Sequence, residues 1–137
     1  MIDILIHGGN RKQRSLIKRA INHSIDMIMP SLRTLRLEVE LKEMIDYGSV
    51  QQKSGYNTLY MELNKKQNFD QLLETTMHEM VHVKQSITRD WTTYYTKCFW
   101  KGVDYTDTYY SQQPWERQAF RMQGKLVKSY NKKFKSK

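Results

Sequence analysis

Residues 68–87 read NFDQLLETTMHEMVHVKQSI. Apolar and small side chains recur there at intervals of three and four residues: Phe69, Leu72, Leu73, Thr76, Met77, Met80 and Ile87. This spacing follows the 3.6-residue period of an α-helix and continues for about five turns. The stretch therefore predicts an amphipathic helix that begins near Asn68 and buries its Phe69 and Leu72 side.

The same predicted helix carries the pattern H-E-x-x-H at His78, Glu79 and His82. Residues four apart on a helix share a face, so both imidazoles can point at a single ion. Glu79 lies on the adjacent side, where it can take a proton from water without binding the metal. The pattern predicts a zinc site with Glu79 as general base, because zinc takes imidazole nitrogens as ligands.

A catalytic zinc site needs a third protein ligand. The metzincin extension is excluded, because Gln85 and Thr88 stand where it requires glycine and histidine. Of the downstream carboxylates, Glu116 is favoured as the ligand because it lies in the first turn of a helix predicted from Pro114 to about Tyr130.

The surroundings of Glu116 suit that role. Ala119 shares its face and is small enough for a close approach to the zinc helix, while Trp115 and Phe120 can anchor the helix in the core. The alternatives left open are a role for Glu116 at the helix dipole, and Asp104 or Asp107 as ligand. His7 and His23 are interpreted as surface or satisfied polar residues.

The remaining elements predict an α+β protein. Ile2–Ile6 is expected to form a short buried strand, followed by a helix that is capped by Asn10 and ends before Pro30. Alternating apolar residues predict strands at 35–42 and 58–64, paired antiparallel across a polar turn at 46–55. Residues 88–113 show no clean period and are expected to be irregular, with a short helix inside.

Composition narrows the class of protein. The chain has 137 residues, 39% hydrophobic and 27% charged, which fits one domain spanning residues 1–137. No run approaches the roughly 20 apolar residues of a membrane-spanning helix. The N-terminus has Asp3 where a signal peptide would be positively charged, and the single cysteine, Cys98, has no partner for an internal disulfide. These features predict a cytoplasmic protein.

The formal net charge is +9. Much of the excess lies in two clusters, namely Arg11, Lys12, Arg14, Lys18 and Arg19 near the start, and Lys125, Lys128, Lys132, Lys133, Lys135 and Lys137 near the end. Such clusters are interpreted either as a solvated helix face plus a basic tail at 131–137, or as a surface that contacts nucleic acid.

His78-Glu79-x-x-His82 followed by Glu116-x-x-Ala119 on a second helix resembles the gluzincin class of zinc metallopeptidases. The compact α+β layout is similar to that of small zincins of bacteria and phages, including SprT-type and ImmA/IrrE-type domains. The resemblance covers roughly half the chain: the strand at 58–64, the zinc helix and the last helix. SprT-type domains usually supply a third histidine, whereas none follows His82, so the glutamate fits the IrrE-like comparison better.

The resemblance implies a zincin-like fold, in which a small, mainly antiparallel sheet packs against the H-E-x-x-H helix and a C-terminal ligand helix. It implies one Zn²⁺ held by His78, His82 and Glu116, and cleavage of a peptide or protein substrate by a zinc-bound water that Glu79 activates. A tyrosine is expected to stabilise the oxyanion, at most one of Tyr94, Tyr95, Tyr105, Tyr109 and Tyr110. Tyr60 and Glu62 would flank a substrate groove along the strand at 58–64.

A second interpretation is a zincin-derived binding module, with a structural or vestigial metal and a basic surface for nucleic acid or a partner. The retained Glu79 favours the enzyme, because a structural metal site has no use for a base beside the ion. The high positive charge favours the binding module.

Overall fold

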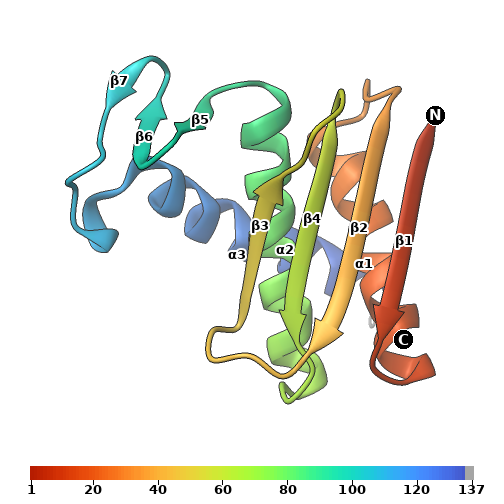
Figure 1. Ribbon diagram of the computed structural model, residues 1–137. Coiled ribbons are helices and arrows are strands. Elements are labelled where there is room, and N and C mark those ends of the chain that lie inside the picture. Colours follow the sequence, from red (N-terminus) through yellow and green to blue (C-terminus); the bar gives the residue numbers. More distant parts are fainter. Residues whose placement is uncertain (135–137) are drawn as a thin grey trace.

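A four-stranded sheet with three helices on one face forms the body of the molecule, and a small second sheet stands beside it (Figure 1). Figure 1 is a ribbon of the computed structural model, which describes residues 1–134. The main elements are β1 (Ile2–Gly8), α1 (Arg11–Ile28), β2 (Leu35–Lys42), β3 (Gly48–Gln52), β4 (Thr58–Asn64), α2 (Phe69–Ile87) and α3 (Pro114–Phe134). The α+β class predicted from the sequence is confirmed.

The strands of the large sheet lie in the order β1-β2-β4-β3. β1 pairs parallel to β2, β2 pairs parallel to β4, and only β3 runs antiparallel, along the outer edge of β4. The antiparallel pairing predicted for the strands at 35–42 and 58–64 is therefore wrong. The segment predicted as a turn contains β3, which returns the chain to the starting end of β2, so that β4 enters the sheet in the same direction as β2.

The alternating patterns of β2 and β4 are confirmed, since one side of each strand is buried against the helices. Leucines, methionine and valine fill this layer: Leu35, Leu37, Val39, Leu41, Leu59, Met61 and Leu63. β1 differs from its prediction as a buried strand. It occupies the sheet edge, and its Leu5 is 50% exposed.

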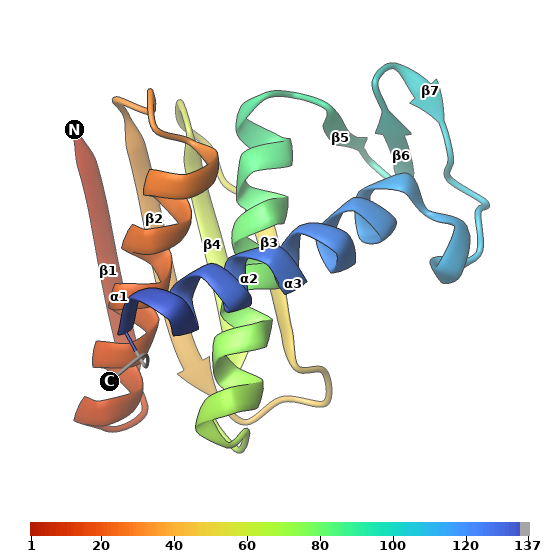
Figure 2. The same ribbon diagram turned by 180° about the vertical axis from the view of Figure 1, so that it is seen from behind.

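α2 is the central helix, lying between the sheet and α3. Leu72, Met80 and Val83 face the sheet core, whereas Leu73 and Met77 belong to a second cluster with Ala119, Leu126 and Tyr130 of α3. Figure 2 shows α3 crossing α1 and α2 on the side away from the sheet. The helix carrying the H-E-x-x-H pattern is thus held from both sides.

Helix starts agree with the sequence signals. The side chain of Asn10 accepts a hydrogen bond from the backbone N–H of Gln13, and the side chain of Gln13 accepts one from the backbone N–H of Asn10, which forms the predicted capping box. Asn68 caps α2 in the same way through the N–H of Gln71. Phe69, predicted to be buried in the first turn of α2, is instead 48% exposed.

The segment between α2 and α3 is more regular than its sequence suggests. It forms a three-stranded antiparallel sheet, β5 (Trp91–Tyr94), β6 (Lys97–Trp100) and β7 (Val103–Asp104), followed by a 3₁₀ turn, η1 (Tyr110–Gln112). Tyr95 and Lys101 take positive φ angles at the two hairpin turns. At the second turn Gly102, which also has a positive φ angle, is a turn signal that was overlooked, whereas the Tyr95 turn carries no such signal.

The C-terminal helix is longer than predicted. α3 continues to Phe134, so the first residues of the predicted tail at 131–137 are helical, and residues 135–137 lie outside the described part of the chain. Within residues 1–134, no helix combines the length and the hydropathy needed to cross a bilayer.

Gly48 lets β3 pack closely against α2. A Cβ atom at this position would lie 2.8 Å from Cγ2 of Thr75 and 3.2 Å from the carbonyl oxygen of Glu62. Thr75 is β-branched and its hydroxyl is bonded to Gln67, so it cannot move aside freely. We expect Gly48→Ala to lower the free energy of unfolding by about 1–3 kcal/mol, as overpacking does.

Gly124 provides the matched control for this substitution. It lies within α3 and a Cβ atom there would meet nothing within 4 Å. Gly124→Ala should therefore raise the free energy of unfolding by about 0.5–1 kcal/mol, because alanine is the better helix former. Urea unfolding of both variants measures the two effects, and changes of equal sign would contradict the packing argument at Gly48.

Candidate metal centre

Three potential metal-binding side chains converge between α2 and the start of α3. His78 and His82 lie one turn apart on α2, and Glu116 lies in the first turn of α3. Oε1 of Glu116 is 2.9 Å from Nε2 of His78 and 3.2 Å from Nε2 of His82. All three donor atoms fall within 4.8 Å of one another. The spacing predicted from the sequence thus brings these three residues together.

The other nitrogen of each imidazole is fixed by a glutamine. Nδ1 of His78 donates to Oε1 of Gln123 at 2.8 Å, and Nδ1 of His82 donates to Oε1 of Gln85 at 2.7 Å. Gln85 is itself oriented, since its amide nitrogen donates to the carbonyl oxygen of Trp115 and to Oε1 of Gln118. The proton of each ring is therefore held on Nδ1.

The position of the imidazole protons determines which ligands the site can bind. A neutral imidazole with its proton on Nδ1 has a lone pair on Nε2. Two such lone pairs and a carboxylate oxygen face one another around Glu116, and they repel unless a proton or a cation lies between them. Two imidazole nitrogens and one carboxylate oxygen, with outer partners on both rings, match the ligand set of a catalytic zinc site.

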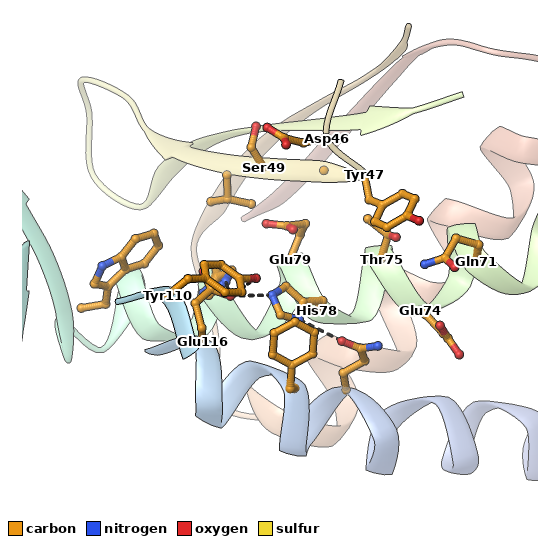
Figure 3. Close-up of a pocket in the computed structure, with 16 residues that line it drawn as sticks. Asp46, Tyr47, Ser49, Gln71, Glu74, Thr75, His78, Glu79, Tyr110 and Glu116 are labelled. Carbon is orange, nitrogen blue, oxygen red and sulfur yellow. Dashed lines mark hydrogen bonds and ion pairs between the residues drawn. The ribbon is translucent and has the colours of Figure 1, made fainter. Parts of the chain in front are cut away.

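Glu79 lies beside this cluster without joining it. Its carboxylate points across the cavity toward β3 (Figure 3), and the residue is 6% exposed. Burial raises the pKa of Glu79; the nearby His82 and His78 lower it, and Glu116 raises it, with a net upward shift. A carboxylate held in this way can accept a proton from a molecule in the cavity.

Within the cluster, Glu116 and His82 shift each other's pKa values toward their charged forms. Burial by itself would raise the pKa of Glu116, but when the two imidazoles also carry a proton on Nε2, hydrogen bonds from His78 and His82 together with their charges lower it to about 2. Burial by itself would lower the pKa of His82, yet the hydrogen bond to Glu116 and the charges of Glu79 and Glu116 raise it overall. Glu116 is therefore ionised, and its negative charge can partly neutralise a bound cation.

A cavity of about 640 Å³ opens over the cluster. β3 contributes one wall through Gly48, Ser49 and Val50, and α2 and α3 contribute the other. Figure 3 shows the carboxylate of Glu79 above His78, toward β3, and Glu116 to the left of His78. Phe120, predicted to anchor α3 in the core, is 53% exposed and lines this cavity against the ring of His78. Trp115 is buried, as predicted.

Of the five tyrosines predicted as candidate oxyanion donors, Tyr110 alone is among the residues lining this cavity. Its hydroxyl lies 3.3 Å from Oε1 of Glu116, and burial, followed by the charge of Glu116 and the hydrogen bond to it, raises its pKa to about 12. Tyr94, Tyr95 and Tyr109 are at least 66% exposed and do not line the cavity. Tyr105 packs its ring against Trp115.

Tyr60 and Glu62 are not brought to the site. They lie on the sheet face turned away from the helices, where Tyr60 donates to Glu40 and Glu62 pairs with Lys42. β4 is paired on both sides, with β2 and with β3, so a peptide cannot add to it. The free sheet edge beside the cavity belongs to β3, a strand that the sequence did not predict.

The alternative ligands also lie apart from the cluster. Asp104 accepts hydrogen bonds from Thr106 in the small sheet. His7 lies near Glu38 on the sheet surface, and His23 bonds to Ser129 between α1 and α3. Among residues 1–134, the group of possible metal ligands that meets here contains only His78, His82 and Glu116.

The glutamines that orient the imidazoles were not predicted from the sequence, since a carboxylate, a backbone carbonyl or water is the usual partner of a metal-binding histidine. Gln85 lies three residues after His82 on the same helix, a spacing that could have signalled it. Gln123 is 45 residues from His78, and only the packing of α3 on α2 reveals it. Comparison of the chain with protein-family models, curated proteins and solved structures gave no match.

Proposed function

We propose that the protein is a zinc-dependent endopeptidase of the gluzincin kind, with His78, His82 and Glu116 as ligands and Glu79 as general base. The observation that carries the proposal is the meeting of three ligand atoms within 4.8 Å beside a free carboxylate in one cavity. The position of α2 between the sheet and a helix that supplies the glutamate supports the zincin-like interpretation.

Each residue has a distinct role in this proposal. A zinc ion in the site would supply Lewis-acid polarisation of a carbonyl group and lower the pKa of water. Glu79 takes the proton of the attacking water and passes it to the leaving amine, so the peptide bond breaks while the proton count is conserved. Gln85 and Gln123 keep the imidazoles in the orientation that presents Nε2 to the ion.

Tyr110 is the proposed donor to the tetrahedral oxyanion. Its hydroxyl reaches the edge of the ligand cluster, as the 3.3 Å distance to Glu116 shows. A phenol is protonated near neutral pH and can donate a hydrogen bond, and the surroundings of Tyr110 raise its pKa further. It lies in η1, the end of the segment that joins the small sheet to α3.

The free edge of β3 is the proposed site for the peptide backbone. Within residues 1–134, β3 is paired only with β4, and its residues Gly48–Val50 line the cavity opposite Glu79. An extended peptide could continue the sheet there through main-chain hydrogen bonds. An unfolded or loop segment of a protein, at least a few residues long, is therefore the expected substrate class.

Removal and return of the metal test the proposal directly. Purified protein is incubated with a quenched-fluorescence peptide library, then with a chelator, and then with excess Zn²⁺. We expect hydrolysis in the first sample, loss of hydrolysis after chelation, and recovery with about one zinc per chain. Hydrolysis that survives complete metal removal would overturn the proposal, as would a protein that binds no zinc.

The glutamine partner of His78 gives a finer prediction. Gln123→Leu removes the acceptor of the Nδ1 proton and should weaken zinc binding roughly 10–100-fold. Gln123→Glu keeps an acceptor of the same length and should preserve binding. Competition with a chelator of known affinity measures both constants, and equal affinity in the two variants would contradict the orienting role of Gln123.

A further inference from the structure

Positive charge is concentrated in two of the three helices. α1 and α3 contain eleven of the 23 lysines and arginines but only two of the 14 acidic residues, Asp26 and Glu116. Glu116 is turned inward to the metal centre. The exposed sides of α1 and α3 are therefore strongly basic.

On α3 the charges form a single row. Arg117, Arg121, Lys125, Lys128 and Lys132 follow one another at intervals of four, four, three and four residues. At 100° per residue these five lie within about 80° of one another around the helix and span about 22 Å along it. All five are exposed, on the side opposite the buried Ala119, Leu126 and Tyr130. We refer to these five residues as the basic row.

The positive charges of the basic row are not neutralised by acidic side chains of the described residues. Among residues 1–134, none of its five members forms an ion pair. Like charges at i,i+3 and i,i+4 destabilise a helix, so the row works against the stability of α3. A polyanion lying along it would remove this repulsion.

α1 carries further positive charge beside α3. The guanidinium group of Arg19 lies 5.4 Å from the ring centre of Phe134 and 3.4 Å from the hydroxyl of Tyr130, both on α3. The exposed Lys18 is its neighbour on α1. In Figure 2, α3 crosses the outside of α1 at this end, so Lys18 and Arg19 add positive charge beside α3, on the flank that faces α1 and not in line with the basic row.

We propose that the basic row binds a nucleic-acid duplex through its phosphate backbone. A double helix carries one negative charge per about 1.7 Å of its length, enough to face every member of a 22 Å row. Surfaces for single strands stack bases on aromatic rings. Aromatic rings meet the row only at its first end, where Arg117 and Arg121 line a hollow with Trp100 and Tyr105. Tyr130, the one aromatic residue between Lys125 and Lys132, is buried. The row is therefore suited to the backbone of a duplex, whose bases are already stacked. This surface lies apart from the metal centre and does not depend on the proposed peptidase activity.

The test uses the full chain and a fluorescein-labelled 20-base-pair DNA duplex of arbitrary sequence, with binding followed by anisotropy. About five phosphate contacts give a slope of log K against log salt near −4.5, or roughly a 500-fold loss of affinity between 50 and 200 mM salt. Lys125→Glu/Lys128→Glu should lower affinity at least 10-fold at 50 mM salt and reduce that slope by about 2.

A variant with the same change of net charge on the opposite side of the molecule is the control. Arg36 and Lys53 lie on the sheet face away from the helices, and both are exposed. Arg36→Glu/Lys53→Glu should change affinity less than about 3-fold, with folding of both variants checked by circular dichroism. An equal loss in the two variants, no binding at 50 mM salt, or tighter binding of the matching single strand or of acidic phospholipid vesicles would each overturn the proposal.

Discussion

Replacing Glu79 by glutamine is expected to abolish peptide hydrolysis while zinc content stays at about one per chain. Glutamine keeps the size of the side chain but cannot take a proton, and loss of a general base costs roughly 10²–10⁴-fold in rate. Zinc should be retained, because Glu79 lies outside the group formed by His78, His82 and Glu116. Hydrolysis of a fluorogenic peptide and elemental analysis of the same preparation measure the two quantities.

Glu74 offers a matched control for this prediction. It is another carboxylate of α2 that lines the same cavity, away from the ligand atoms (Figure 3). Glu74→Gln should leave kcat within a few-fold of the wild type, since it removes the same charge without removing the base. If Glu79→Gln retains full activity, Glu79 is not the base; if both variants lose zinc, the effect is one of folding.

Replacing Glu116 by alanine is expected to remove zinc from the purified protein. The side chain brings the one carboxylate oxygen that meets both imidazole Nε2 atoms, at 2.9 and 3.2 Å. Loss of a ligand should weaken binding by more than the roughly 10–100-fold that loss of an outer partner costs. Zinc per chain by elemental analysis, with circular dichroism to verify folding, measures the result.

Asp107 provides the comparison for the ligand assignment. Sequence reasoning kept it as a rival of Glu116, and in the structure it is exposed in the segment before η1. Asp107→Ala should retain about one zinc per chain. Retention of zinc by Glu116→Ala together with its loss from Asp107→Ala would reverse the assignment of the third ligand.

The parts of the fold that were predicted correctly depend on local signals. The caps at Asn10 and Asn68 and the helical period of 68–87 depend on residues three or four apart. They can therefore be predicted from the sequence without knowledge of tertiary contacts. The meeting of His78, His82 and Glu116 was also predicted. There the spacing of the two histidines is local, and the small Ala119, fully buried between helices, allows the approach of α3.

The parts that were missed depend on tertiary pairing. β3 is polar and contains Gly48, a composition that indicates a turn. The structure shows instead that this glycine allows close packing against Thr75. The direction of β4 relative to β2 then follows from β3, so one missed strand changed the expected topology. Phe120 was assigned to the core by its hydrophobicity, yet its ring forms a wall of the cavity beside His78.

The position of Glu116 on a different helix from the histidines ties ligand binding to conformational stability. Its carboxylate is 38 residues from His78 along the chain, and it reaches the cluster only while the first turn of α3 is docked on α2. Any ion that binds the three side chains together therefore favours the docked state. At 100 times its dissociation constant, such a ligand adds about 2.7 kcal/mol to the free energy of unfolding. Amide hydrogen exchange in the first turn of α3 should accordingly be the most sensitive reporter of ligand occupancy.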